Sequence, residues 1–284
     1  MAPNPQTLSG GSLLLAWQLK GKRVLIIGGG DVASGRIESV LVADALITLI
    51  APRRGLHPLT KKFIDNCSDR ITYRDRGFAG VSDLQKIDMV LTAIDNVDKS
   101  REISQLCREM KIPVNVADIP ALCDFYFGSQ IRSGPLQVMI STNGQSPKLA
   151  NIIRKKIETV IPECAAEAIE KVGELRSKLR ERAPGVGGDL SKQRMRWMVD
   201  ICSSWDMEEL SQLDHEMMTK LLEDGWEKNK VLRPEEVSPS LKIEGKNGGS
   251  PKVSSLVLPA AVSFVAGAAC TAAFLLLHNP VVRK

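Results

Sequence analysis

A glycine cluster at the end of an apolar run is the first feature of this sequence that could do chemistry. The run 23–30, RVLIIGGG, is rich in β-branched residues, and the next three residues complete G-x-G-x-x-A with Gly28, Gly30 and Ala33. Glycines let the backbone approach a pyrophosphate, and the N–H groups at the start of the next helix can bind it. We therefore expect a dinucleotide site here, with a tight turn without ligand as the alternative.

A second candidate is Asp118, which ends the apolar run 113–117, PVNVA. Ligands of open α/β sheets bind at the carboxyl ends of the strands, where a carboxylate can exchange protons with a substrate. Aspartate also often shapes turns, so the residues alone leave both roles open. A turn is the better explanation of Asp124, six residues later, and packing is the better explanation of Cys123.

The elements that would position these residues alternate between strands and helices. Apolar runs typical of buried strands occupy 23–30, 46–52, 88–94 and 113–117. Two of the intervals carry apolar residues at helical spacing, namely Ala33, Ile37, Val40 and Leu41, then Ile103, Leu106, Cys107 and Met110. Asp98 is expected to cap the second of these helices. This alternation predicts an α/β fold with a parallel sheet over residues 1–118.

The pattern changes after residue 118. FYFGSQI and LQVMIST flank RSGP, which predicts a hairpin. Ser146-Pro147 then begins a helix with an apolar face, made of Leu149, Ile152, Ile153, Ile157 and Val160. Residues 163–182 and about 190–230 are helical in pattern, and 233–252 has the composition of a flexible linker.

Polar and basic residues surround the start of this helix. The loop 141–147, STNGQSP, contains Ser141, Thr142 and Asn143, and Lys148 follows it on a helix that also carries Arg154, Lys155 and Lys156. Such a loop could hold an anionic group at the helix start. An ordinary loop with a solvated basic face is the alternative.

The second strand ends in Ala51-Pro52-Arg53-Arg54 instead of the acid that usually binds the 2′-hydroxyl of a dinucleotide. The arginines would suit a 2′-phosphate, or simply a solvated loop.

Composition restricts the class of protein further. The net charge of +5 is mild and does not choose among an acidic small molecule, an anionic membrane and nucleic acid. The six cysteines are scattered without a CxxC pair and there are only three histidines, which argues against a zinc site and a secreted disulfide framework. We therefore expect reduced thiols and no protein-bound metal.

The two ends of the chain differ. The first 20 residues do not have the pattern of a secretory signal, because the apolar part LLLAW is too short. Residues 253–277 contain no charge, and about 20 apolar residues suffice to cross a membrane. Behind a polar linker, this segment predicts a C-terminal hydrophobic helix that anchors the chain in a membrane, with a helix buried in the protein as the alternative.

Three stretches in this order, LKGKRVLIIGGGDVA, VNVADIPALCDFYFGSQI and LQVMISTNGQSPKLANIIRKKIE, resemble the siroheme synthase family, and most closely its fungal bifunctional members. The resemblance covers about residues 13–230, and its central block 113–157 is the most specific part. It implies a Rossmann-type NAD-binding domain at 1–118, a small α+β dimerisation region at 119–146 and a helical domain at 147–232. The linker 233–252 and the tail 253–277 lie outside it.

The resemblance also assigns roles to residues. The catalytic aspartate of the family falls on Asp118. Beyond the glycine motif, its NAD contacts fall on a set of positions next to strands: Asp31, Val32, Pro52, Arg53, Ile94 and Asn115. Some bacterial members carry a phosphorylatable serine where this chain has Thr142. They also carry a methyltransferase domain for which 284 residues leave no room, so we expect another protein to methylate the substrate.

The activity implied is that of a homodimeric enzyme that oxidises precorrin-2 to sirohydrochlorin with NAD⁺ and then inserts Fe²⁺ as a substrate to give siroheme. The basic helix near Lys148 and the loop residues Ser141, Thr142 and Asn143 would bind this carboxylate-rich tetrapyrrole. Two alternatives remain: a dehydrogenase without chelatase activity, and a membrane-tethered NAD-binding sensor. We expect no nucleic-acid partner, and a catalytic part that faces the cytosol from the mitochondrial outer membrane or the endoplasmic reticulum.

Overall fold

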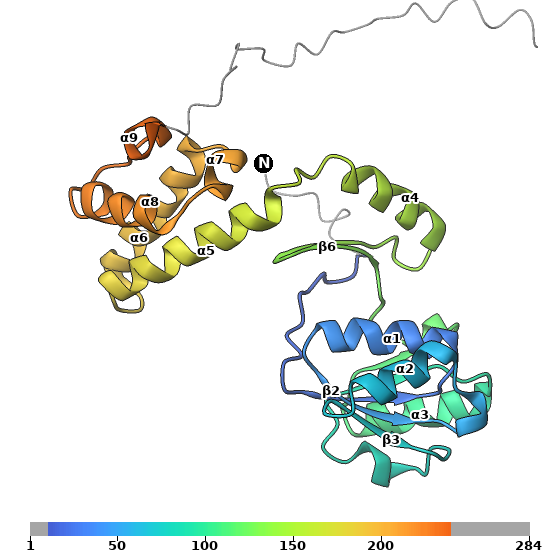
Figure 1. Cartoon of the computed structure of the whole chain (residues 1–284). Helices are drawn as coiled ribbons and strands as arrows, with labels where there is room; N and C mark the ends of the chain where they lie inside the picture. The colour runs from blue at the N-terminus through green and yellow to red at the C-terminus, as the bar shows by residue number, and fades with distance from the viewer. Residues whose placement is uncertain (1–10, 240–284) are drawn as a thin grey trace, which may run out of the picture. The chain divides into compact units, whose positions relative to one another are not determined.

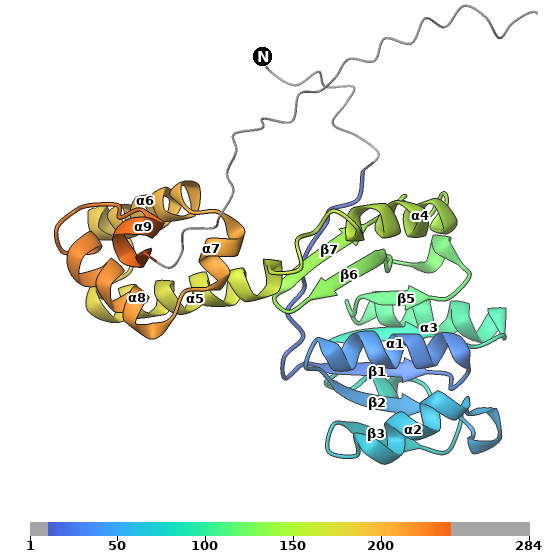
Figure 2. The same cartoon turned by 45° about the horizontal axis from the view of Figure 1, so that its top comes forward.

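The structure is a computed structural model and describes residues 11–239. The chain divides into two compact units, Met1–Val231 and Leu232–Lys284. The first unit contains a parallel sheet in the order β3-β2-β1-β4-β5 (Figures 1 and 2). Its strands are β1 (Arg23–Ile27), β2 (Leu46–Ile50), β3 (Ile71–Arg74), β4 (Met89–Thr92) and β5 (Val114–Val116). The expected α/β fold with a parallel sheet is confirmed.

Helices connect the strands and cover both faces of the sheet. They are α1 (Asp31–Val42), α2 (Pro58–Asn66) and α3 (Val97–Glu109), with short 3₁₀ turns at Arg53–Gly55, Val81–Leu84 and Pro120–Leu122. The inner residues of α1 and the partly buried Phe63 and Ile64 of α2 pack on one face, whereas Ile103 and Cys107 of α3 pack on the other. The central strands are buried on both faces, which explains their continuous apolar runs.

Three local features differ from the sequence-based expectations. Strand β3 and helix α2 were not predicted. Strand β3 lacks an apolar run because only Ile71 is buried in it and the strand lies at the edge of the sheet. The cap of α3 is Asn96, whose Oδ1 accepts the N–H of Lys99 at 2.8 Å, and not Asp98, which lies in the first turn.

The segment after β5 closes the other edge of the sheet. The N–H of Asp124 donates to the carbonyl of Val114, and the Asp124 carboxylate accepts the N–H of Val114, both at 2.9 Å. Leu122 and Cys123 pack against the α3 side of the sheet, whereas Phe125 and Phe127 pack against the α1 side. Asp124 therefore has the structural role that its sequence context favours.

The expected hairpin is present as strands β6 (Ser129–Ser133) and β7 (Leu136–Ile140). It is followed by α4 (Pro147–Glu158), which begins after Ser146 as predicted, although the Ser146 side chain makes no capping bond. The apolar face of α4 is largely uncovered, with Leu149 55% exposed and Ile152 and Ile153 41% and 44% exposed.

The rest of the described chain is helical. It comprises α5 (Ala165–Arg182), α6 (Gly188–Ser204), α7 (Met207–Ser211), α8 (His215–Lys220) and a π-helical turn at Leu221–Trp226. Trp197 of α6 packs edge-to-face on Trp226 and donates to the carbonyl of Lys230. His215 is exposed at the start of α8.

In the second unit, the short helix α9 (Pro234–Val237) forms the beginning of the segment expected to be a linker. Within residues 11–239, no helix is long and apolar enough to cross a membrane. The apolar segment 253–277, expected to be a membrane anchor, lies outside the described residues.

Candidate active site

The glycine turn lies where β1 and β4 end side by side. The N–H of Gly28 donates to the carbonyl of Ile50 in β2, and the N–H of Ala93 donates to the carbonyl of Ile27 in β1. Gly28 has φ of +113°, and a Cβ on it would overlap the carbonyl oxygen of Ala93. Only glycine permits both this backbone conformation and this close approach. Ile94 follows Ala93, so it lies at the point where the strand order reverses, the usual ligand crevice of such sheets.

The loop after β2 packs over the same turn. The N–H of His57 donates to the carbonyl of Gly29 at 2.8 Å, and a Cβ on Gly29 would lie 2.5 Å from Leu56. The His57 imidazole lies 3.8 Å from the Asp31 carboxylate at the start of α1. The glycine turn is therefore held between β4 and the 53–57 loop.

The residues of the turn fit a dinucleotide. A Cβ on Gly30 would meet nothing within 4 Å, so open space adjoins the turn at the start of α1. No side chain caps α1, which leaves its first N–H groups available to a phosphate. Asp31 and Val32 are exposed there, whereas Ala33 is fully buried and lets the helix pack closely.

The other residues expected to contact the cofactor divide into two groups. Pro52 and Arg53 are exposed directly after β2, at the same edge as the glycine turn. Asn115 instead lies inside β5 with 4% exposure, and its amide donates to the carbonyl of Phe125 at 2.8 Å. The structure thus shows Asn115 holding the segment after β5 in place, and a contact with NAD stays a prediction.

Asp118 lies at the same edge of the sheet, beyond β5. The N–H of Ala117 donates to the carbonyl of Thr92 at 2.9 Å, which continues the β4–β5 pairing up to Asp118. Asp118 is exposed and has φ of +61°, a left-handed conformation that costs free energy for a residue with a side chain. Since β5 is two strands from β1, Asp118 and the glycine turn lie about 10 Å apart along the edge.

Arg36 is a residue that sequence reasoning missed. Its guanidinium lies over the ring of Phe127, 3.7 Å from the ring centroid. Burial lowers the pKa of Arg36, while the electrostatic influences of Cys123 and then of the Asp118 carboxylate oppose this shift. Arg36 also lines a hollow of about 360 Å³ together with Val32, Phe127 and Gln130. A lone arginine inside a helical pattern gives no signal in sequence, because its neighbours come from elsewhere in the chain.

In the loop predicted to bind substrate, the hydroxyls accept hydrogen bonds from the backbone of the same loop. Thr142 Oγ1 accepts the N–H of Ser146, and Ser141 Oγ accepts the N–H of Asn143, both at 3.1 Å. Asn143 and Lys148 are exposed. Among residues 11–239, no hydrogen bond or ion pair joins Ser141, Thr142 or Lys148 to Asp118.

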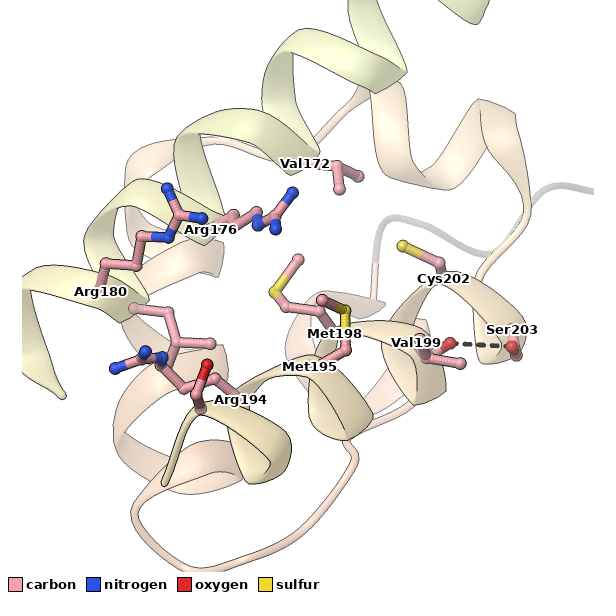
Figure 3. Close-up of a pocket in the computed structure, with 11 residues that line it drawn as sticks. Val172, Arg176, Arg180, Arg194, Met195, Met198, Val199, Cys202 and Ser203 are labelled. Atoms are coloured by element: carbon pink, nitrogen blue, oxygen red, sulfur yellow. Dashed lines mark hydrogen bonds between the residues drawn. The ribbon is translucent and has the colours of Figure 1, made fainter. Parts of the chain in front are cut away.

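A second hollow, of about 320 Å³, lies between α5 and α6 (Figure 3). Its lining combines apolar side chains with the arginines of α5, and includes Val172, Arg176, Arg180, Met195, Met198 and Val199. Arg194, at its edge, already donates to the carbonyls of Ala183 and Gly185. None of the residues expected to be functional lies in this hollow.

Residues 11–239 contain no group of three or more His, Cys, Asp and Glu side chains that could hold a metal ion. The cysteines of this range, including Cys107 and Cys123, are free thiols. Burial raises the pKa of Cys107 to about 12, so this residue stays protonated in the core.

The fold and the glycine turn define a dinucleotide-binding protein, and a family model described as putative NAD(P)-binding matches residues 15–129. The models described as the central and C-terminal parts of sirohaem biosynthesis proteins match residues 133–159 and 162–232. The siroheme biosynthesis protein of Schizosaccharomyces pombe is 52% identical over 214 residues, which cover 75% of this chain and 79% of that protein. The chain therefore belongs to the family of the fungal siroheme biosynthesis proteins.

More distant relatives support the same family assignment. The siroheme biosynthesis protein of Saccharomyces cerevisiae is 34% identical over 66% of this chain and 80% of its own length. The siroheme synthase of Thioalkalivibrio sulfidiphilus is 36% identical over 63% of this chain but only 35% of its own length. The solved structure of SirC, a precorrin-2 dehydrogenase, covers 76% of this chain and all of its own, with a TM-score of 0.54 and 21% identity, and so supports the fold.

Two alanine variants separate the roles of the glycines. Gly28→Ala should lower the melting temperature strongly, because the new Cβ overlaps the Ala93 carbonyl and Gly28 has positive φ. Gly30→Ala should melt as the wild type does and yet bind NADH more weakly, because its Cβ enters only the open space beside α1. Thermal melts and NADH fluorescence titrations measure both. Equal melting of the two variants would contradict the close approach at Gly28.

Proposed function

We propose that this chain makes siroheme from precorrin-2, by NAD-dependent dehydrogenation to sirohydrochlorin and then by insertion of Fe²⁺. The observation that carries the proposal is the position of Asp118, an exposed acid at the carboxyl edge of the sheet that also presents the glycine turn. Membership of the family of fungal siroheme biosynthesis proteins supports it. The first step is a dehydrogenase reaction and the second a chelatase reaction.

A single carboxylate can serve both steps, because both release protons from the tetrapyrrole. NAD⁺, when bound, supplies the acceptor for the hydride. Asp118 accepts the proton that precorrin-2 loses in the oxidation, and then the two pyrrole N–H protons, one after the other, as Fe²⁺ replaces them. Between these transfers Asp118 returns each proton to solvent, which its exposure permits.

The cofactor would be held by the glycine turn and by residues at the ends of β2 and β4. The chain offers Gly28, Gly30, Asp31, Val32, Ala33, Pro52, Arg53 and Ile94 for this role. Asn115 would contribute by fixing the segment after β5. We favour NAD over NADP.

Iron is a substrate in this scheme and ends in the four nitrogens of the macrocycle. The protein therefore needs no permanent iron site. An enzyme that only dehydrogenates remains the alternative within the same family. Analysis of the products with and without Fe²⁺ separates the two, because only the bifunctional enzyme forms siroheme.

Arg36 is suited to bind a carboxylate of the tetrapyrrole. Its guanidinium lies over Phe127 and interacts electrostatically with Asp118. A substrate carboxylate bound to Arg36 would therefore bring the tetrapyrrole toward Asp118. The exposed Lys148 and the loop residues Ser141, Thr142 and Asn143 would bind further carboxylates from the α4 side.

The uncovered apolar face of α4 supports a homodimer. Leu149, Ile152 and Ile153 form a face that a second copy of the chain would remove from water. We assign 1–118 to the NAD-binding domain, 119–146 to dimerisation together with this face, and 147–232 to a helical domain.

The variant Asp118→Asn should lower the rates of dehydrogenation and iron insertion by about 10²–10⁴-fold each, because an amide cannot accept the proton. NADH binding and the melting temperature should stay close to wild type, since no hydrogen bond to another described residue depends on the Asp118 side chain. Each reaction is followed by absorbance in a separate assay.

Asp124→Asn is the matched control, because Asp124 is another exposed acid on the same segment, bound to Val114. It should affect stability more than turnover. Wild-type rates in folded Asp118→Asn would remove this residue from the mechanism, and loss of dehydrogenation alone would mean that the two reactions do not share one carboxylate.

Arg36→Gln should lower kcat/KM for precorrin-2 about tenfold or more, chiefly through KM, because a charge-assisted bond to a carboxylate is lost. Arg36→Lys should restore part of this loss. NADH binding should not change. Arg101→Gln, which removes an exposed arginine from α3, is the control. An unchanged KM in Arg36→Gln would show that this side chain does not bind substrate.

We also propose that residues 253–277 anchor the chain in the mitochondrial outer membrane or the endoplasmic reticulum, with the catalytic part in the cytosol. The basis is the absence of charge from this segment. Full-length protein should remain in the membrane fraction after carbonate extraction, whereas a chain that lacks 253–284 should be released with both activities intact. Full-length protein in the supernatant would contradict the anchor.

A further inference from the structure

The sequence has no acid at the end of β2, where dinucleotide-binding sheets usually provide one for the 2′-hydroxyl of the ribose. Arg53 and Arg54 stand there instead. Arginines at this position usually accompany a 2′-phosphate, which contradicts the preference for NAD. The structure brings an acid to this place from the neighbouring strand.

That acid is Asp75, the first residue after β3. Its Oδ1 accepts the N–H of Arg53 at 2.7 Å, and its Oδ2 lies 3.7 Å from Nε of the same residue. The carboxylate therefore lies beside the backbone that follows β2, although 22 residues separate the two in sequence. The Asp75 side chain is 51% exposed, and a carboxylate has about four acceptor positions, so it can accept further hydrogen bonds.

The neighbours of Asp75 in sequence do not neutralise it. Arg74 and Arg76 both direct their guanidinium groups to the buried Asp83, at 3.0 Å and 2.7 Å. Tyr73 donates its hydroxyl to the carbonyl of Ala51, which ties the end of β3 to the end of β2. Burial, and then the negative charge of Asp75, raise the pKa of Tyr73.

We propose that Asp75 is the residue that selects NAD over NADP, by accepting a ribose hydroxyl and by repelling a 2′-phosphate. It replaces, from β3, the acid that other sheets carry on β2. Its pairing with Arg53 also occupies the arginine that would otherwise bind the phosphate. This inference rests on the proposal that the chain uses NAD, and it names the residue responsible.

Removal of the Asp75 charge changes the two affinities in opposite directions. NADH loses the charged acceptor for its hydroxyl. For NADPH, a like charge beside the 2′-phosphate is removed, and Arg53 becomes available to bind that phosphate. Arg54 lies next to Arg53 and makes no ion pair with any residue of the described range. Because charges a few ångströms apart interact appreciably even near a surface, we expect the NADPH:NADH affinity ratio to rise about tenfold or more.

The test is a fluorescence titration of full-length wild type, Asp75→Asn and Asp75→Ala with NADH and NADPH, independent of turnover. The matched control is Asp69→Asn, because Asp69 is an exposed acid that precedes the same strand and so lies at its other end. A second control is the double variant Arg53→Gln with Asp75→Asn, which should lose the gain in NADPH affinity. Thermal melts show whether each variant is folded.

The expected result is a wild type that prefers NADH, a ratio shifted toward NADPH in both Asp75 variants, and no shift in Asp69→Asn. An unchanged ratio in a folded Asp75 variant would overturn the inference, even if both affinities fall. A wild type that prefers NADPH would also overturn it. Failure of the proposed function is seen separately, as NADH binding without turnover of precorrin-2.

Discussion

The close approach of the backbone at Gly28 to the carbonyl of Ala93 is the constraint on which the site depends. Because no Cβ separates them, β1 and β4 end side by side, and the N–H of Ala93 bonds to the carbonyl of Ile27 in β1 while the N–H of Gly28 bonds to Ile50 in β2. The 53–57 loop then packs on Gly29 from the other side through Leu56 and His57. The turn is thereby fixed before any cofactor binds, so little ordering is required on binding.

Opposite charges are arranged along the carboxyl edge of the sheet in two places. Asp75 pairs with Arg53 at the β2–β3 end, and Asp118 acts on Arg36 near the β5 end. In both places the acid is exposed and lies one or two residues after the end of a strand. The arginine lies in the loop after β2 in one case and in helix α1 in the other. The strands therefore fix the acids, and a ligand can bind beside these charges without disturbing the sheet.

The parts of this structure that the sequence predicts are those with strong local patterns. The runs 23–30 and 46–52 predict β1 and β2, and Ser146-Pro147 predicts the start of α4, because each signal lies within a few residues. Asp118 stands out because it interrupts such a run. Asp75 and Arg36 do not, because their roles depend on Arg53, Phe127 and Asp118, each distant in sequence. Strand β3 was not predicted for a related reason: an edge strand buries too few of its side chains to require an apolar run.

The bonding of Asp124 to Val114 has a consequence for the behaviour of the protein at high concentration. An open edge strand offers free backbone groups to any other extended chain, and this is how sheets grow into aggregates. At β5 the N–H and carbonyl of Val114 are both taken by Asp124, and the same residue places a negative charge there. A strand of another chain could extend the sheet at this edge only by displacing the Asp124 side chain from the Val114 N–H, so the sheet ends where the 119–127 segment begins.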